Sequence, residues 1–248
     1  MLNRIPTWVA FSNDYDRLYE ATLKKNKQLD DETHKKYNEA KYKFLEKQLA
    51  ICKKHGVKCM ADFGTLLGII RDGDLIRNDT DLQIFGETLN KDFFDDLDKT
   101  FYAVPSSKQS FKKLFDENDD YHELLYVWLE DLDKDGNKIT FKSPGGATVG
   151  MFGDLMVSYP FKDGKRILRW PGWEVMTYDQ KHADKINTVS FKGFDVPVPS
   201  STTEYIQYFY GEGWKTPQSR FGKYTCEFIN RADAHKYTYS LKDGKYKF

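Results

Sequence analysis

One stretch, FGTLLGIIRDGDLIRNDTDLQIF at residues 63–85, constrains the fold more than any other part of the sequence. Gly64 needs no room for a Cβ atom, and Thr65 has the side chain of a helix N-cap, so the apolar run after them predicts a short buried helix. The RDGD sequence then predicts a turn, and DTDLQIF alternates polar and apolar residues as a half-buried strand does. This short stretch therefore predicts a helix, a turn and a strand that follow one another directly and pack against each other.

The expected strand carries its polar residues on one face. Asp79, Asp81 and Gln83 occupy alternate positions, and side chains at alternate positions of a strand point to the same side. Two neighbouring carboxylates repel each other unless a cation lies between them, and oxygen ligands favour Mg²⁺ or Mn²⁺. The stretch therefore predicts a metal site, with the polar outer face of an edge strand as the alternative.

A further acid, Asp154, stands alone in the apolar run VGMFGDLMVSYPF at residues 149–161. A buried carboxylate is unfavourable without a cation or a hydrogen-bond partner. We therefore expect Asp154 either to share a metal with Asp81 or to bond to buried backbone groups. The N-terminus of the helix at Gly64 can also attract an anion, although a Gly-Thr pair before an apolar helix is most often only a cap.

The rest of the chain predicts helices and strands that do not alternate regularly. Residues 14–55 predict one long helix or two, packed through one apolar stripe or, alternatively, paired in a coiled coil. Residues 201–211 predict a short helix, and residues 121–142 predict a β-hairpin around an Asp-Gly-Asn turn. The expected fold class is α+β, with helices packed on a small mixed sheet.

Composition restricts the function. The chain has 248 residues, enough for one large domain or one domain with an appendage. Its 38 basic and 38 acidic side chains balance, whereas a nucleic-acid binder usually has a basic excess. No window reaches the roughly 18 apolar residues of a membrane span, and the first residues lack the apolar core of a signal peptide. With only three scattered cysteines, we expect a soluble, cytoplasmic chain with reduced thiols.

Two motifs resemble one known family. GTLLGIIRDGDLIRNDTDLQI, at residues 64–84, resembles the signature of the LicD family, which includes fukutin and fukutin-related protein. FKGFDVPVPSSTTEYIQYFYGEGWKTP, at residues 191–217, resembles the late block of the same family. The resemblance implies a nucleotidyltransferase-like fold. With the helical pattern before it and the mildly basic stretch after it, we expect a division into an N-terminal helical region (1–55), a catalytic domain (56–217) and a basic C-terminal tail (218–248).

The resemblance also implies an activity. Members of the family transfer a phospho-alcohol, such as phosphocholine or ribitol phosphate, from its CDP-activated form to a sugar hydroxyl and release CMP. By position, Gly64 and Thr65 would hold the donor phosphate, and Arg71 would pair with a phosphate or brace the acidic face. Asp81 would be a ligand of Mg²⁺ or Mn²⁺, and Asp154 would be the third carboxylate and a candidate proton acceptor. The implied partners are a CDP-alcohol donor and a glycan acceptor, with no nucleic acid and no membrane span.

One departure from the family pattern concerns the metal site. Gln83 stands where the motif has its last aspartate, so the expected site loses one negative charge. An amide oxygen can still bind a hard cation, and Asp79 on the same face can compensate if the acidic pair is shifted by two residues. Two alternatives remain: a catalytically impaired relative that binds a nucleotide or glycan, and a nucleotidyltransferase that attaches a nucleotide.

Overall fold

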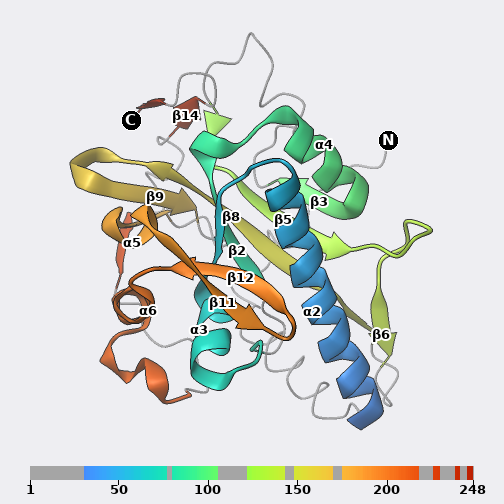
Figure 1. Cartoon of the computed structure of the whole chain (residues 1–248). Coiled ribbons are helices and arrows are strands. Elements are labelled where there is room, and N and C mark those ends of the chain that lie inside the picture. The colour runs from blue at the N-terminus through green and yellow to red at the C-terminus, as the bar shows by residue number, and fades with distance from the viewer. Residues whose placement is uncertain are drawn as a thin grey trace.

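The computed structural model describes residues 31–76, 80–105, 122–142, 148–169, 175–217, 226–229, 238–240 and 245–247. A mixed β-sheet lies at the centre of the molecule with helices packed around it (Figure 1). Within the described residues this sheet runs β1–β2–β8–β9–β10–β13, and β5 pairs with both β8 and β3. The predicted α+β class is confirmed. The predicted N-terminal and C-terminal regions are described only in part.

The main sheet combines strands from most of the described chain. Its strands are β1 (Cys59–Ala61), β2 (Asp81–Phe85), β3 (Phe101–Pro105), β5 (Tyr126–Asp131), β8 (Phe152–Pro160), β9 (Lys165–Arg169), β10 (Val175–Asp179) and β13 (Glu227–Ile229). The α-helices are α2 (Asp31–Lys54), α3 (Phe63–Asp72), α4 (Lys91–Thr100), α5 (Lys181–Asp184) and α6 (Thr202–Tyr210). Smaller sheets pair β11 (Ile186–Phe191) with β12 (Phe194–Pro199), β6 (Thr140–Lys142) with β7 (Thr148–Gly150), and β14 (Thr238–Ser240) with β4 (His122–Glu123) and β15 (Lys245–Lys247).

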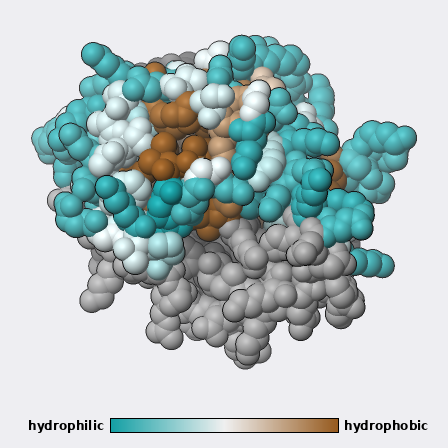
Figure 2. All heavy atoms as spheres, turned by 60° about the horizontal axis from the view of Figure 1, so that its bottom comes forward, coloured by the Kyte–Doolittle hydropathy of each residue, from teal (hydrophilic) through white to brown (hydrophobic). Residues whose placement is uncertain are grey.

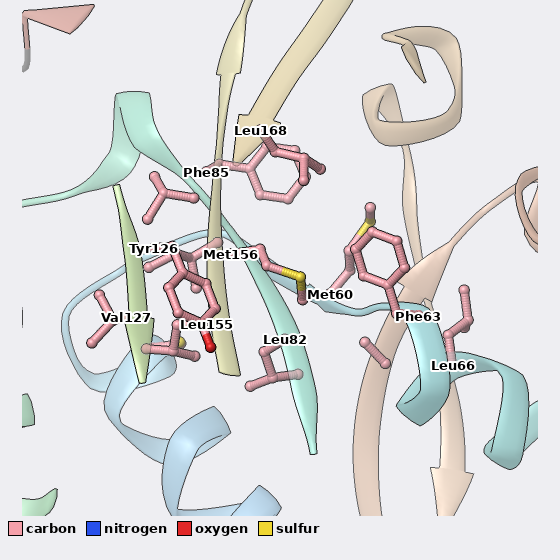
Figure 3. Close-up of a cluster of buried hydrophobic side chains, with 14 of the residues drawn as sticks. Met60, Phe63, Leu66, Leu82, Phe85, Tyr126, Val127, Leu155, Met156 and Leu168 are labelled. Atoms are coloured by element: carbon pink, nitrogen blue, oxygen red, sulfur yellow. The ribbon is translucent and has the colours of Figure 1, made fainter. Parts of the chain in front are cut away.

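The pairing of β2 with β8 determines where the site lies. These two strands run parallel, whereas β8 is antiparallel to β5 and β9. Alternate residues of the strands form one apolar face, whose side chains are almost fully buried: Leu82, Ile84, Val127, Leu155 and Val157. Buried side chains from β2, β5 and β8 lie together with those of α3 in the close-up of the core (Figure 3). The polar residues of β2 and β8 therefore project from the opposite face.

Helix α2 covers the apolar face. Its late turns bury an aromatic and aliphatic stripe, as the sequence predicts, and Phe44 packs edge-on against Phe101 of β3 at 5.3 Å. Gly153 of β8 faces this helix, because a Cβ atom there would lie 2.9 Å from Nε2 of Gln48. The helix ends before Gly56, which has a positive φ of 65°. Residues 14–30 of the predicted helical region lie outside the described residues.

Helix α3 and helix α6 lie on the polar face. The prediction that Thr65 is the N-cap of α3 is wrong: the helix begins at Phe63, and the Asp62 side chain accepts a hydrogen bond from the Phe63 N–H at 2.8 Å. Asp62 takes this position because it follows β1 directly and keeps an extended conformation. At the other end, Gly73 has a φ of 65° and ends the helix.

The predicted hairpin at residues 121–142 does not form as expected. The turn is present, since Asp133 accepts hydrogen bonds from the N–H groups of Asp135 and Asn137, both at 2.9 Å. The strand after the turn, however, pairs with β7, and its approach meets the strand before the turn through the bridge between Leu132 and Lys138 and an ion pair between Lys138 and Glu130. β5 instead pairs with β3 and β8, because its apolar residues are buried more completely inside the main sheet.

The surface on the side of α3 and α6 is not uniformly polar. Turned so that the bottom of Figure 1 comes forward, the described surface shows a hydrophobic patch with hydrophilic residues beside it (Figure 2). None of the helices in the described part of the chain is both long enough and apolar enough to cross a membrane.

Candidate active site

Two carboxylates meet where β2 and β8 run side by side. Asp81 and Asp154 are register partners on these parallel strands, so their side chains project from the same face. Asp81 is 5% exposed, and Asp154 is partly exposed. The structure thus brings together the two acids for which the sequence predicts a shared metal.

The surroundings of Asp154 raise its pKa to about 6. Burial among neighbouring atoms is the main cause, because it disfavours the charged form. The Tyr126 hydroxyl opposes this effect by donating a hydrogen bond of 2.5 Å to Oδ1 of Asp154, and the contact with Asp81 lowers the pKa as well. A carboxylate with such a pKa accepts a proton more readily than an ordinary carboxylate does, and it is still mostly charged at neutral pH.

The corner formed by Gly64 and Thr65 holds Asp81 in place. The Gly64 N–H, in the first turn of α3, donates to Oδ2 of Asp81 at 3.2 Å, and the Asp81 N–H donates to the Thr65 hydroxyl at 2.6 Å. The positive end of the α3 dipole therefore faces the Asp81 carboxylate. Gly64 and Thr65 are themselves buried, so in this structure the corner positions an acid rather than presenting its own groups to solvent.

Arg71 lies away from this pair. It lies seven positions after Gly64 along α3, which corresponds to about 10 Å of helix axis. Its guanidinium makes two hydrogen bonds to the neighbouring Asp72 carboxylate, at 2.8 and 2.7 Å. These bonds raise the pKa of Arg71 above its usual value. Its role in phosphate binding stays a prediction.

Gln83 is integrated into the sheet. Its side chain is fully buried, and its amide nitrogen donates to the Ser158 hydroxyl at 3.0 Å and to the Tyr178 hydroxyl. Its amide oxygen accepts from the Tyr205 hydroxyl of α6 at 3.3 Å. Gln83 shares a face with Asp81, as predicted, but its polar atoms are used by the protein. Asp79, the other predicted ligand, lies outside the described residues.

Asp62 is a buried acid that sequence reasoning missed. It is 0% exposed, and its N–H donates to the Asp81 carbonyl at 3.2 Å, which extends the β1–β2 pairing. Oδ1 accepts from the Phe63 N–H and from the Tyr205 hydroxyl at 3.0 Å, whereas Oδ2 has no hydrogen-bond partner. Burial raises its pKa to about 7. An aspartate two residues before Gly64, ahead of an apolar run, is the sequence signal that could have identified it as the helix N-cap.

The sequence analysis also did not single out two aromatic rings that lie beside Asp154. Trp128 is the register partner of Asp154 on β5, and its ring stacks on that of Phe152 with centroids 4.7 Å apart and an interplanar angle of 15°. Both residues are partly exposed. Flat apolar rings of this kind suit stacking against a base or a sugar.

The donor set fits a hard divalent cation. Asp81 and Asp154 supply carboxylate oxygens, the ligands that Mg²⁺ and Mn²⁺ prefer, and a cation between them would relieve their repulsion. Among the residues that the structure describes, no three or more His, Cys, Asp or Glu side chains gather in a way that could hold a metal. The protein would therefore provide two carboxylates, and the substrate phosphates and water would complete the coordination.

Comparison with known proteins identifies the domain. A family model described as LicD/FKTN/FKRP, nucleotidyltransferase domain, matches residues 56–201. The match includes α3, β2 and β8, and thus both acids of the site. No curated protein matches the chain.

Proposed function

Because the chain belongs to the LicD/FKTN/FKRP nucleotidyltransferase-domain family, we propose that it is a transferase that moves a phospho-alcohol from a CDP-activated donor to a glycan hydroxyl. The observation that carries this proposal is the pair formed by Asp81 and Asp154, next to the N-terminus of α3. Phosphoryl transfer depends mainly on positioning and on neutralising charge, and this arrangement can supply both.

Asp81 and Asp154 would hold Mg²⁺ or Mn²⁺. When bound, the cation would neutralise the negative charge of the donor pyrophosphate. Asp81 is suited to this role because the Gly64 N–H and the Thr65 hydroxyl fix the start of β2. Tyr126 holds Asp154 in a similar way from β5.

In the proposed reaction, the acceptor hydroxyl attacks the phosphorus that carries the alcohol. A new bond forms from the acceptor oxygen to that phosphorus, and the bond to the oxygen shared with CMP breaks. CMP leaves with the bonding electrons, and the proton of the hydroxyl passes to Asp154 if the cation does not fully engage that carboxylate, or otherwise to water. The stacked pair of Trp128 and Phe152 would offer a surface to the donor base or the acceptor sugar.

The experiment that tests this function is an assay of CMP release. We would incubate the protein with a panel of CDP-alcohols and a glycan acceptor in Mg²⁺ or Mn²⁺, and compare wild type with Asp81→Asn, Asp154→Asn and the control Asp135→Asn, which changes an exposed turn residue. We expect release by wild type and the control, and at least a hundredfold loss in the two site variants. Equal release by all four proteins would contradict the proposal.

Gln83 favours a second candidate, a relative that binds a nucleotide or glycan without turning it over. In that case wild type would bind CDP-alcohols without releasing CMP. The same assay with CTP tests the remaining alternative, a nucleotidyltransferase, because that reaction releases pyrophosphate rather than CMP.

A further inference from the structure

We propose that the site of this chain takes a single divalent cation, between Asp81 and Asp154, and that Gln83 is a structural residue of the sheet rather than a ligand. This inference rests on the proposed function and specifies its metal site. It goes against the expectation from the family motif, in which position 83 carries a second acid of the same strand.

The first argument is that the Gln83 amide is already satisfied by the protein. Its nitrogen donates to Ser158 and Tyr178, and its oxygen shares the Tyr205 hydroxyl proton with Oδ1 of Asp62. These partners come from β8, β10 and α6, so the amide joins three elements that are distant in sequence. Turning the oxygen toward a metal would break these bonds in a place without solvent, and leaving a buried polar group unpaired is unfavourable.

The second argument is a fixed positive charge near position 83. The Nε of Arg166 donates to the Ser158 hydroxyl at 3.1 Å, and that hydroxyl also receives the Gln83 amide. Arg166 is 3% exposed and makes a two-point pair with Glu87, at 2.9 and 2.8 Å. A second divalent cation beside Gln83 would therefore lie close to a buried guanidinium, which is unfavourable where screening by solvent is weak.

The third argument is the position of the remaining buried acid. Asp62 pairs with Asp81 through the backbone at the end of β1, so Asp62, Asp81 and Asp154 form a row across three neighbouring strands. The Asp62 carboxylate, however, turns to the first turn of α3 and to Tyr205. The polar face thus keeps three acids, but only Asp81 and Asp154 are left as the register partners that a cation can join.

A Mn²⁺ titration followed by electron paramagnetic resonance tests this inference without any substrate. We expect wild type to bind one Mn²⁺, and Asp154→Asn to bind it at least tenfold more weakly. Gln83→Met keeps the length of the side chain but removes both its oxygen and its nitrogen, so we expect a lower unfolding temperature but a Mn²⁺ affinity within twofold of wild type. Gln83→Asp is expected to bind one Mn²⁺ and to unfold at a lower temperature than wild type.

Two results would overturn the single-cation site while leaving the proposed function intact: two Mn²⁺ bound by wild type, or a tenfold loss of affinity in Gln83→Met. No binding by wild type would contradict the metal dependence of the proposed function itself. Circular dichroism of each variant shows whether it is folded. If neither Gln83 variant folds, the number of ions bound by wild type still decides between one site and two.

Discussion

Asp81 and Asp154 stand opposite each other on two parallel strands, and a backbone N–H from a third element, helix α3, donates to the first of them. The geometry of the pair is therefore set by strand register and by a helix terminus, and both are rigid. A site supported in this way needs little rearrangement to receive a cation.

Metal binding should stabilise the protein. A ligand that binds only the folded state adds about 2.7 kcal/mol at a hundredfold excess over its dissociation constant. We expect the melting temperature to rise when MgCl₂ replaces EDTA at constant ionic strength, as measured by scanning calorimetry. Asp154→Asn should show no such rise, whereas the exposed-turn control Asp135→Asn should behave like wild type. A rise of equal size in Asp154→Asn would place the ion elsewhere.

Tyr126→Phe should raise the pKa of Asp154 in the metal-free protein. The Tyr126 hydroxyl stabilises the charged carboxylate, so its removal leaves burial as the dominant influence. The change can be followed by NMR titration of the ¹³C-labelled aspartate carboxyls in EDTA. Tyr102→Phe, on the neighbouring strand β3, is the matched control and should leave the titration of Asp154 unchanged. An unchanged pKa in Tyr126→Phe would show that the hydrogen bond is not important in solution.

The stability of the metal-free protein should fall as the pH rises from about 4 to about 7. Asp62 has a pKa of about 7 in the folded protein against an ordinary value of 3.8, so the folded state binds more protons than the unfolded state in this interval. The free energy of unfolding then decreases with pH, by up to about 1.4 kcal/mol per pKa unit for such a group. Urea unfolding at a series of pH values in EDTA measures this slope.

Asp62→Asn provides the comparison for that slope. Asparagine keeps an oxygen for the Phe63 N–H and for Tyr205 but cannot titrate, so the slope should become shallower. Asp154, with a pKa of about 6, should account for part of the slope that remains. A slope as steep as that of wild type would mean that Asp62 does not hold a proton in the folded state.

Gly153→Ala should disturb the fold beside the site. A Cβ atom at this position would lie 2.2 Å from Oγ1 and 2.7 Å from the carbonyl oxygen of Thr80, so β8 would have to move away from the start of β2. We expect a loss of about 1–3 kcal/mol in urea unfolding, together with weaker Mn²⁺ binding. Gly150→Ala is a suitable control, because a Cβ atom there meets nothing within 4 Å.

The sequence indicated which side of a strand a residue faces, but it said much less about which distant residues that side chain contacts. Alternation correctly placed Asp81 and Gln83 on one side of a strand, and the isolation of Asp154 in an apolar run indicated that it needed a partner. The surroundings of Gln83 could not be predicted, because Tyr178 and Tyr205 reach it from strands and helices more than ninety residues away. The hairpin at residues 121–142 failed for the same reason: the turn is a local property, whereas the choice of strand partner depends on the whole sheet.

The parallel pairing of β2 with β8 has a consequence for how the chain assembles. Parallel neighbours cannot be joined by a tight turn, and here α4, β3 and β5 come between them in the sequence. The contact between the two acids is therefore of high contact order and forms only after a long loop has closed. Cation binding should consequently appear late in refolding, so that Mn²⁺ uptake after dilution from urea would serve as a kinetic marker for completion of the sheet.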